Sequence, residues 1–207
     1  LEASYEIDTL NLISFSAWGW LGNNQSNTDL DYTYYNRANS ISSQYSTLSH
    51  SHSNYGSVSG TLDYQRSFAK KDRTLTASYQ FEYTPNNSDY TTESDGIINW
   101  DTYTERSKNK AHGTEQTIQI DYFDPLTEMH QIEGGAKYIM RCNVSDGDRT
   151  QSLWDEPTDT WHDISLPVND LDYTQHILGL YAGYVLKIKK WSGKVGARLE
   201  ATWNDGR

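Results

Sequence analysis

Aromatic side chains are the residues of this sequence best suited to bind a ligand, because aromatic faces bind sugars and other amphipathic molecules. Many of them lie in polar stretches rich in Asn, Ser and Thr. The ligand-binding candidates are Tyr34, Tyr45, Trp100, Tyr103, Trp154 and Trp161. The alternative is that these rings only pack the loops onto one another.

Other residue types offer little chemistry. His50 and His52 form a His-x-His pair that could hold zinc if further ligands converged, but a solvated polar loop is the simpler interpretation. The sequence holds no Gly-x-Ser-x-Gly nucleophile motif, and its single cysteine, Cys142, can form no internal disulfide. We therefore expect a protein that is not an enzyme and uses no cofactor or metal.

The composition points to an all-β protein and excludes some partners. The 207 residues include 16 Tyr and 7 Trp, and the net charge of -11 makes nucleic acid an unlikely ligand. The mean hydropathy is -0.81. No apolar run reaches the ~18 residues of a membrane helix, but a transmembrane barrel needs an apolar residue only at every second position.

Alternation with a period of two dominates the chain and predicts roughly eight strands, the first a stub. The expected strands cover residues 1–5, 12–21, 57–66, 74–84, 114–123, 130–143, 173–187 and 194–203. One side of each is apolar, for example Leu178, Leu180 and Leu199. The other side is polar, and in a membrane barrel it would face the lumen. The predicted lumen-facing residues are Glu133, Lys137, Arg141, Arg198 and Glu200, which we expect to pair with each other or with a plug.

The connections between these strands alternate in length. Those at 6–11, 69–73, 124–129 and 187–193 are short, and those at 22–56, 85–113 and 144–172 are long. Short periplasmic turns and long external loops are typical of an antiparallel up-and-down outer-membrane barrel. A secreted β-sandwich that binds carbohydrate on aromatic loops is the alternative, since its strands would also alternate.

Three segments carry a family resemblance. The first joins Leu171-Asp172-Tyr173, Tyr181, Tyr184 and Trp191 to the run Gly196-Ala197-Arg198-Leu199-Glu200-Ala201-Thr202. The second runs from Tyr64 to Phe81, and the third runs from Asp121 through Pro125 to Tyr138. Together they resemble the barrel of TonB-dependent receptors of the bacterial outer membrane, although Ala197 stands where that family more often has Leu.

The resemblance implies what the chain would do and with what it would associate. Residues 1–207 would be a partial barrel in outer-membrane lipid, without the N-terminal plug domain, which would precede them in the parent protein. The parent would take up a bulky nutrient, coupled to a TonB-type energy-coupling protein and in some cases to a surface lipoprotein. We also expect that these residues alone do not close into a barrel.

Overall fold

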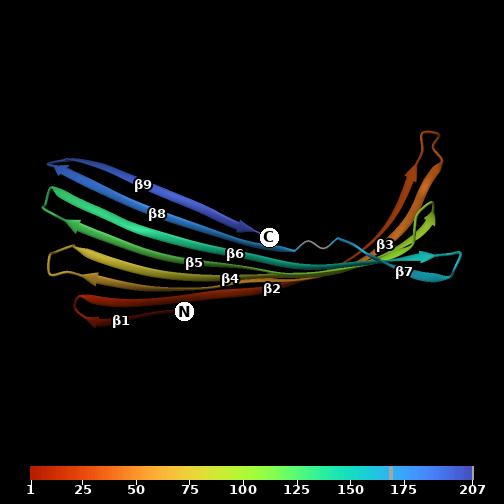
Figure 1. Cartoon of the computed structure of the whole chain (residues 1–207), viewed down its shortest axis with the longest axis horizontal. Coiled ribbons are helices and arrows are strands. Elements are labelled where there is room, and N and C mark those ends of the chain that lie inside the picture. Colours follow the sequence, from red (N-terminus) through yellow and green to blue (C-terminus); the bar gives the residue numbers. More distant parts are fainter. Residues whose placement is uncertain (168–169, 207) are drawn as a thin grey trace.

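The computed structural model describes residues 1–167 and 170–206, and in them the chain forms one antiparallel sheet of nine strands (Figure 1). The strands are β1 (Glu2–Asp8), β2 (Asn11–Tyr35), β3 (Ile41–Ser67), β4 (Thr74–Ile98), β5 (Tyr103–Pro125), β6 (His130–Asp155), β7 (Thr160–Ser165), β8 (Leu171–Ile188) and β9 (Trp191–Gly206). The all-β, up-and-down architecture is the one that the alternation predicts.

The sheet follows the order of the chain. Its order is β1-β2-β3-β4-β5-β6-β8-β9, and the short β7 pairs with the far part of β6. Within the described residues β1 and β9 are the two edges and the sheet is not closed. All nine strands lie in this one sheet, so the β-sandwich alternative, which requires two packed sheets, is wrong. No helix among the described residues has the length and apolar character needed to cross a bilayer.

The connections segregate as expected. Those after β1, β3, β5 and β8 lie at one end of the sheet, which we call the turn end, and those after β2, β4 and β6 lie at the other, the far end (Figure 1). Five connections contain a residue with positive φ: Asn39, Asp72, Asn99, Asp159 and Lys189. Four of these are Asn or Asp, the side chains that best tolerate the left-handed conformation a tight hairpin needs.

The expectation of long loops is wrong in one respect. Most of residues 22–56, 85–113 and 144–172 continue the strands, so β2 and β3 meet in a hairpin whose connection is only residues 36–40. β7, which no pattern predicted, raises the strand number from about eight to nine. In these parts both sides of the strands are polar, so hydropathy does not alternate there even though the backbone pairing continues.

The register gives the sheet two chemically distinct faces. Leu180 lies opposite Leu199 and Ala136, while Tyr181 lies opposite Arg198 on the other side. Side chains alternate strictly along a strand, so this pairing places the predicted apolar set on one side, the apolar face. Its side chains are uncovered: Leu180 is 49% exposed and Leu199 is 75% exposed. The opposite side, which carries Arg198 and Glu200, is the polar face.

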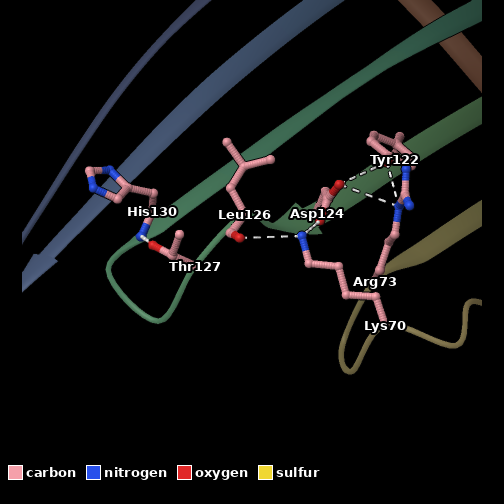
Figure 2. A network of polar contacts seen from close by, with 7 residues as sticks. All are labelled: Lys70, Arg73, Tyr122, Asp124, Leu126, Thr127 and His130. Atoms are coloured by element: carbon pink, nitrogen blue, oxygen red, sulfur yellow. Dashed lines mark hydrogen bonds and ion pairs between the residues drawn. The ribbon is translucent and has the colours of Figure 1, made fainter.

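A polar network joins two connections at the turn end (Figure 2). Lys70 Nζ lies 2.6 Å from Asp124 Oδ1, and Arg73 Nε lies 3.3 Å from Asp124 Oδ2. Arg73 Nε also donates to the Tyr122 hydroxyl, at 2.7 Å, and that hydroxyl donates to Asp124 at 3.1 Å. Lys70 reaches the Leu126 carbonyl at 3.4 Å. The β3–β4 connection is thereby fastened to the end of β5, which holds neighbouring hairpins in register.

The two faces predict opposite responses to the same charge. We expect Leu180→Arg, on the apolar face, to lower the free energy of unfolding from lipid vesicles by roughly 2–4 kcal/mol, because an Arg near the bilayer midplane loses its hydration. Gln80→Arg, on the polar face, is the matched control and should cost little. Urea titration of the protein refolded into vesicles measures both values, and equal losses would contradict the assignment of the faces.

Candidate functional site

The polar face carries charges that neutralise one another across strands. Arg141 Nε lies 2.6 Å from Glu115 Oε2, and its Nη1 donates to Gln175 at 3.2 Å. Ser57 on β3 donates to Glu82 on β4 at 2.8 Å. These contacts tie β3 to β4 and β5 to β6 and β8. Because the side chains are partly solvated, each pair contributes modestly to stability, and their main effect is to make this face wettable.

The five predicted lumen-facing residues share this face. Arg198 and Glu200 form an ion pair with each other, Nη2 to Oε2 at 2.6 Å, within β9. Glu133 pairs with Lys194, a residue outside the predicted set, across β6 and β9 and over the intervening β8. Lys137 makes no ion pair among the described residues. Arg198 can pair with Glu200 on its own strand because side chains two residues apart on one strand point to the same face.

An aromatic cluster lies on the same face towards the far end. The Tyr45 ring stacks on Trp100, with ring centroids 3.9 Å apart and planes 10° apart. Tyr32 and Tyr34 stack on Tyr45 at centroid distances of 4.7 and 6.2 Å. Tyr45 is only 8% exposed and is the single buried hydrophobic residue of the described chain. The cluster therefore acts as a small local core for a sheet that has no second layer.

The β4–β5 connection folds back over the sheet and places Trp100 in this cluster. The Trp100 indole nitrogen donates to the Ser94 hydroxyl at 3.2 Å, and Ser94 is almost fully buried. Asn99 donates to the Ser42 carbonyl at 3.0 Å, which joins the connection to β3. Gly96 makes the approach possible, because a Cβ there would lie 2.0 Å from the Trp100 carbonyl oxygen.

A second group of residues next to the aromatic cluster combines a carboxylate, a guanidinium and a phenol hydroxyl. The Tyr90 hydroxyl donates to Glu105 Oε1 at 2.7 Å, and Arg149 Nε donates to the same oxygen at 2.8 Å. Glu105 is 8% exposed. Its carboxylate raises the pKa of both Tyr90 and Arg149. No pattern in the sequence predicts this group, since its residues lie on β4, β5 and β6 and no spacing in the sequence connects them.

The structure divides the six aromatic candidates between the two sides of the sheet. Tyr34, Tyr45 and Trp100 belong to the cluster, and Tyr103 shares its side because it pairs directly with Ser94. Trp154 follows Leu153, the partner of Tyr103, and so points to the opposite side. There it contacts Trp161 of β7, with centroids 5.4 Å apart. The six residues therefore cannot form one site within this sheet.

The two histidines of the His-x-His pair, His50 and His52, each contact a neighbouring Asn side chain. His50 Nδ1 lies 2.8 Å from the Asn27 amide oxygen, and His52 Nε2 lies 2.9 Å from the Asn54 amide nitrogen. In residues 1–167 and 170–206, no three His, Cys, Asp or Glu side chains converge as metal ligands would.

A wall one sheet thick, with an apolar side, a charged side and up-and-down hairpins whose connections alternate between its two ends, is the architecture of an outer-membrane barrel. The family model of the outer membrane protein beta-barrel family matches residues 66–207. The chain belongs to this family, and its location is the bacterial outer membrane, where it associates with outer-membrane lipid. No curated protein matches the sequence.

The aromatic cluster predicts an unusual tyrosine titration. The Tyr34 hydroxyl and then burial raise the pKa of Tyr45 to about 12, so between pH 10 and pH 12 the unfolded chain would be ionised at this position while the folded chain stays neutral. Folded-state stability should therefore fall as pH rises through this window. We expect Tyr34→Phe to bring the pKa of Tyr45 closer to its ordinary value.

The measurement is the absorbance of ionised tyrosine against pH, with the titration of Tyr45→Phe subtracted in each background. Tyr35→Phe is the control, because Tyr35 neighbours Tyr34 in sequence, is 61% exposed and makes none of the cluster's stacking contacts. A Tyr45 pKa that Tyr34→Phe leaves unchanged would contradict the role given to the Tyr34 hydroxyl.

Proposed function

We propose that this chain is part of the barrel wall of a TonB-dependent outer-membrane receptor that takes up a bulky nutrient. The supporting observation is the polar face, on which ionised side chains of β5, β6 and β9 pair with one another. A small barrel filled by its own side chains has little use for so many charges. A wide lumen that holds water and a plug domain accommodates them at little cost.

The proposal places the polar face towards the lumen and the apolar face towards lipid. Glu133, Lys137, Arg141, Arg198 and Glu200 then line the lumen as structural residues, and the chain has no catalytic role. The far end becomes the external side, where the aromatic cluster meets incoming ligand. A plug domain in the parent protein, a TonB-type energy-coupling protein and a surface lipoprotein are the partners that this function requires or permits.

Cysteine labelling in living cells tests the proposal. In a Cys142→Ser background, Gln80→Cys places a thiol on the polar face and Ile118→Cys places one on the apolar face, where Ile118 is 50% exposed. A water-soluble maleimide should label Gln80→Cys and spare Ile118→Cys. Deleting the energy-coupling protein should change the labelling rate of Gln80→Cys, because plug movement would alternately cover and uncover the lumen wall.

The comparison of the two thiols and the comparison of cells with and without the energy-coupling protein test different parts of the proposal. Equal labelling of the two thiols would show that the polar face does not line an aqueous lumen. A labelling rate at Gln80→Cys that is the same with and without the energy-coupling protein would leave a barrel that is not a TonB-dependent receptor.

A further inference from the structure

A hollow of about 580 Å³ lies over β2 to β6, and none of its lining residues belongs to the aromatic cluster. Trp20, Tyr55, Asn86 and Asn143 line it, each from a different strand. The register places all four on the polar face. Trp20 lies an even number of residues from Ser14 and Ser16 on β2, and Asn143 lies two residues from Arg141 on β6, so each points to the same side of the sheet as those residues. Its size is within the range of ordinary ligand sites.

Two open aromatic rings form one wall of the hollow. The centroids of Trp20 and Tyr55 are 5.7 Å apart, with the ring planes at 72°, so one ring presents its edge to the other. Trp20 is 49% exposed and Tyr55 is 40% exposed, in contrast to the nearly covered Tyr45. Their ring surfaces are therefore available to a ligand, whereas those of the cluster are mostly used in packing.

Amide side chains stand beside these rings, and Asn86 is the direct cross-strand partner of Tyr55. The Asn86 and Asn143 amides make no hydrogen bond to another side chain among the described residues, so each offers both donors and an acceptor. Gly113 lies between them, and a Cβ there would stand 2.7 Å from Thr84 Oγ1 and 3.1 Å from Asn143 Oδ1. The glycine keeps the floor of the hollow open.

We propose that this hollow binds one or two units of a neutral carbohydrate as the ligand enters the barrel. A sugar ring has an apolar C–H side that stacks on aromatic rings and hydroxyl edges that both donate and accept hydrogen bonds, and the hollow supplies both partners. The inference rests on the proposed function, because it requires the polar face to line the path of uptake.

Charge selects a neutral ligand over an acidic one. Residues 21–56, 85–113 and 144–172, the sequence ranges that contain the far end, hold 15 of the 28 acidic residues of the chain and only 5 of the 17 basic ones. The surrounding potential is therefore negative and opposes sulfated, phosphorylated or uronic-acid chains. No Lys or Arg of the described chain lines the hollow, so neither of these cations offsets the repulsion there.

Calorimetric titration of the detergent-solubilised protein tests the proposal. The probes are maltoheptaose, cellohexaose, mannohexaose and xylohexaose, with polygalacturonate as the acidic comparison. At least one neutral probe should bind, and Trp20→Ala should weaken it by roughly tenfold, as the loss of a central aromatic anchor does. Asn143→Ala should weaken the same probe, while Trp20→Phe should restore most of the affinity.

Trp191→Ala is the matched control, because it removes an equally large ring, 80% exposed, at the turn end. Its affinity should equal that of the unmodified protein. The proposal is overturned if no neutral probe binds, if polygalacturonate binds more tightly, or if Trp20→Ala binds as tightly as Trp191→Ala. Absence of sugar binding would not change how the labelling of Gln80→Cys depends on the energy-coupling protein. The failure of this site and the failure of the transport proposal are therefore distinguishable.

Discussion

Backbone hydrogen bonding is the constraint on which this structure depends. A lipid bilayer offers no water to the peptide groups, so each strand must pair with its neighbours along its whole membrane-spanning length. The continuous registers from β2 through β9 meet that demand. Once the pairing is set, the pleat leaves each residue only two directions, towards lipid or away from it. The separation of Leu180 and Leu199 from Arg198 and Glu200 follows from that single geometric fact.

The same pairing continues beyond the part that lipid would cover, and there a different force must hold the strands together. The sheet has no second layer, and its far end is rich in Ser, Thr and Asn. Stacking of Tyr32, Tyr45 and Trp100, together with the burial of Glu105 between Tyr90 and Arg149, supplies local cohesion. The far end is therefore an extension of the wall that these local contacts hold together.

Prediction from the sequence succeeded where hydropathy alternates and failed where it does not. Residues 130–143 and 194–203 alternate apolar side chains with polar ones that include Glu133, Lys137, Arg141, Arg198 and Glu200, and the register places both sets as expected. Residues 22–56 are polar on both sides, so nothing in the pattern distinguishes a loop from a long hairpin. The candidate list had the same limit: it named Tyr45 and Trp100 for their residue type, but it also grouped them with Trp154, which lies on the opposite side.

The sequence by itself determined the all-β class, the two-faced wall and which connections share an end of the sheet, because these depend on the order of residues and strands along the chain. The tertiary structure alone decided which strands are neighbours at each height, and so which side chains meet. Tyr90, Glu105 and Arg149 are 15 and 44 residues apart yet share one carboxylate oxygen. Trp20, Tyr55, Asn86 and Asn143 surround one hollow only because the five strands β2 to β6 lie side by side. Such contacts depend on cross-strand register, which no local pattern encodes.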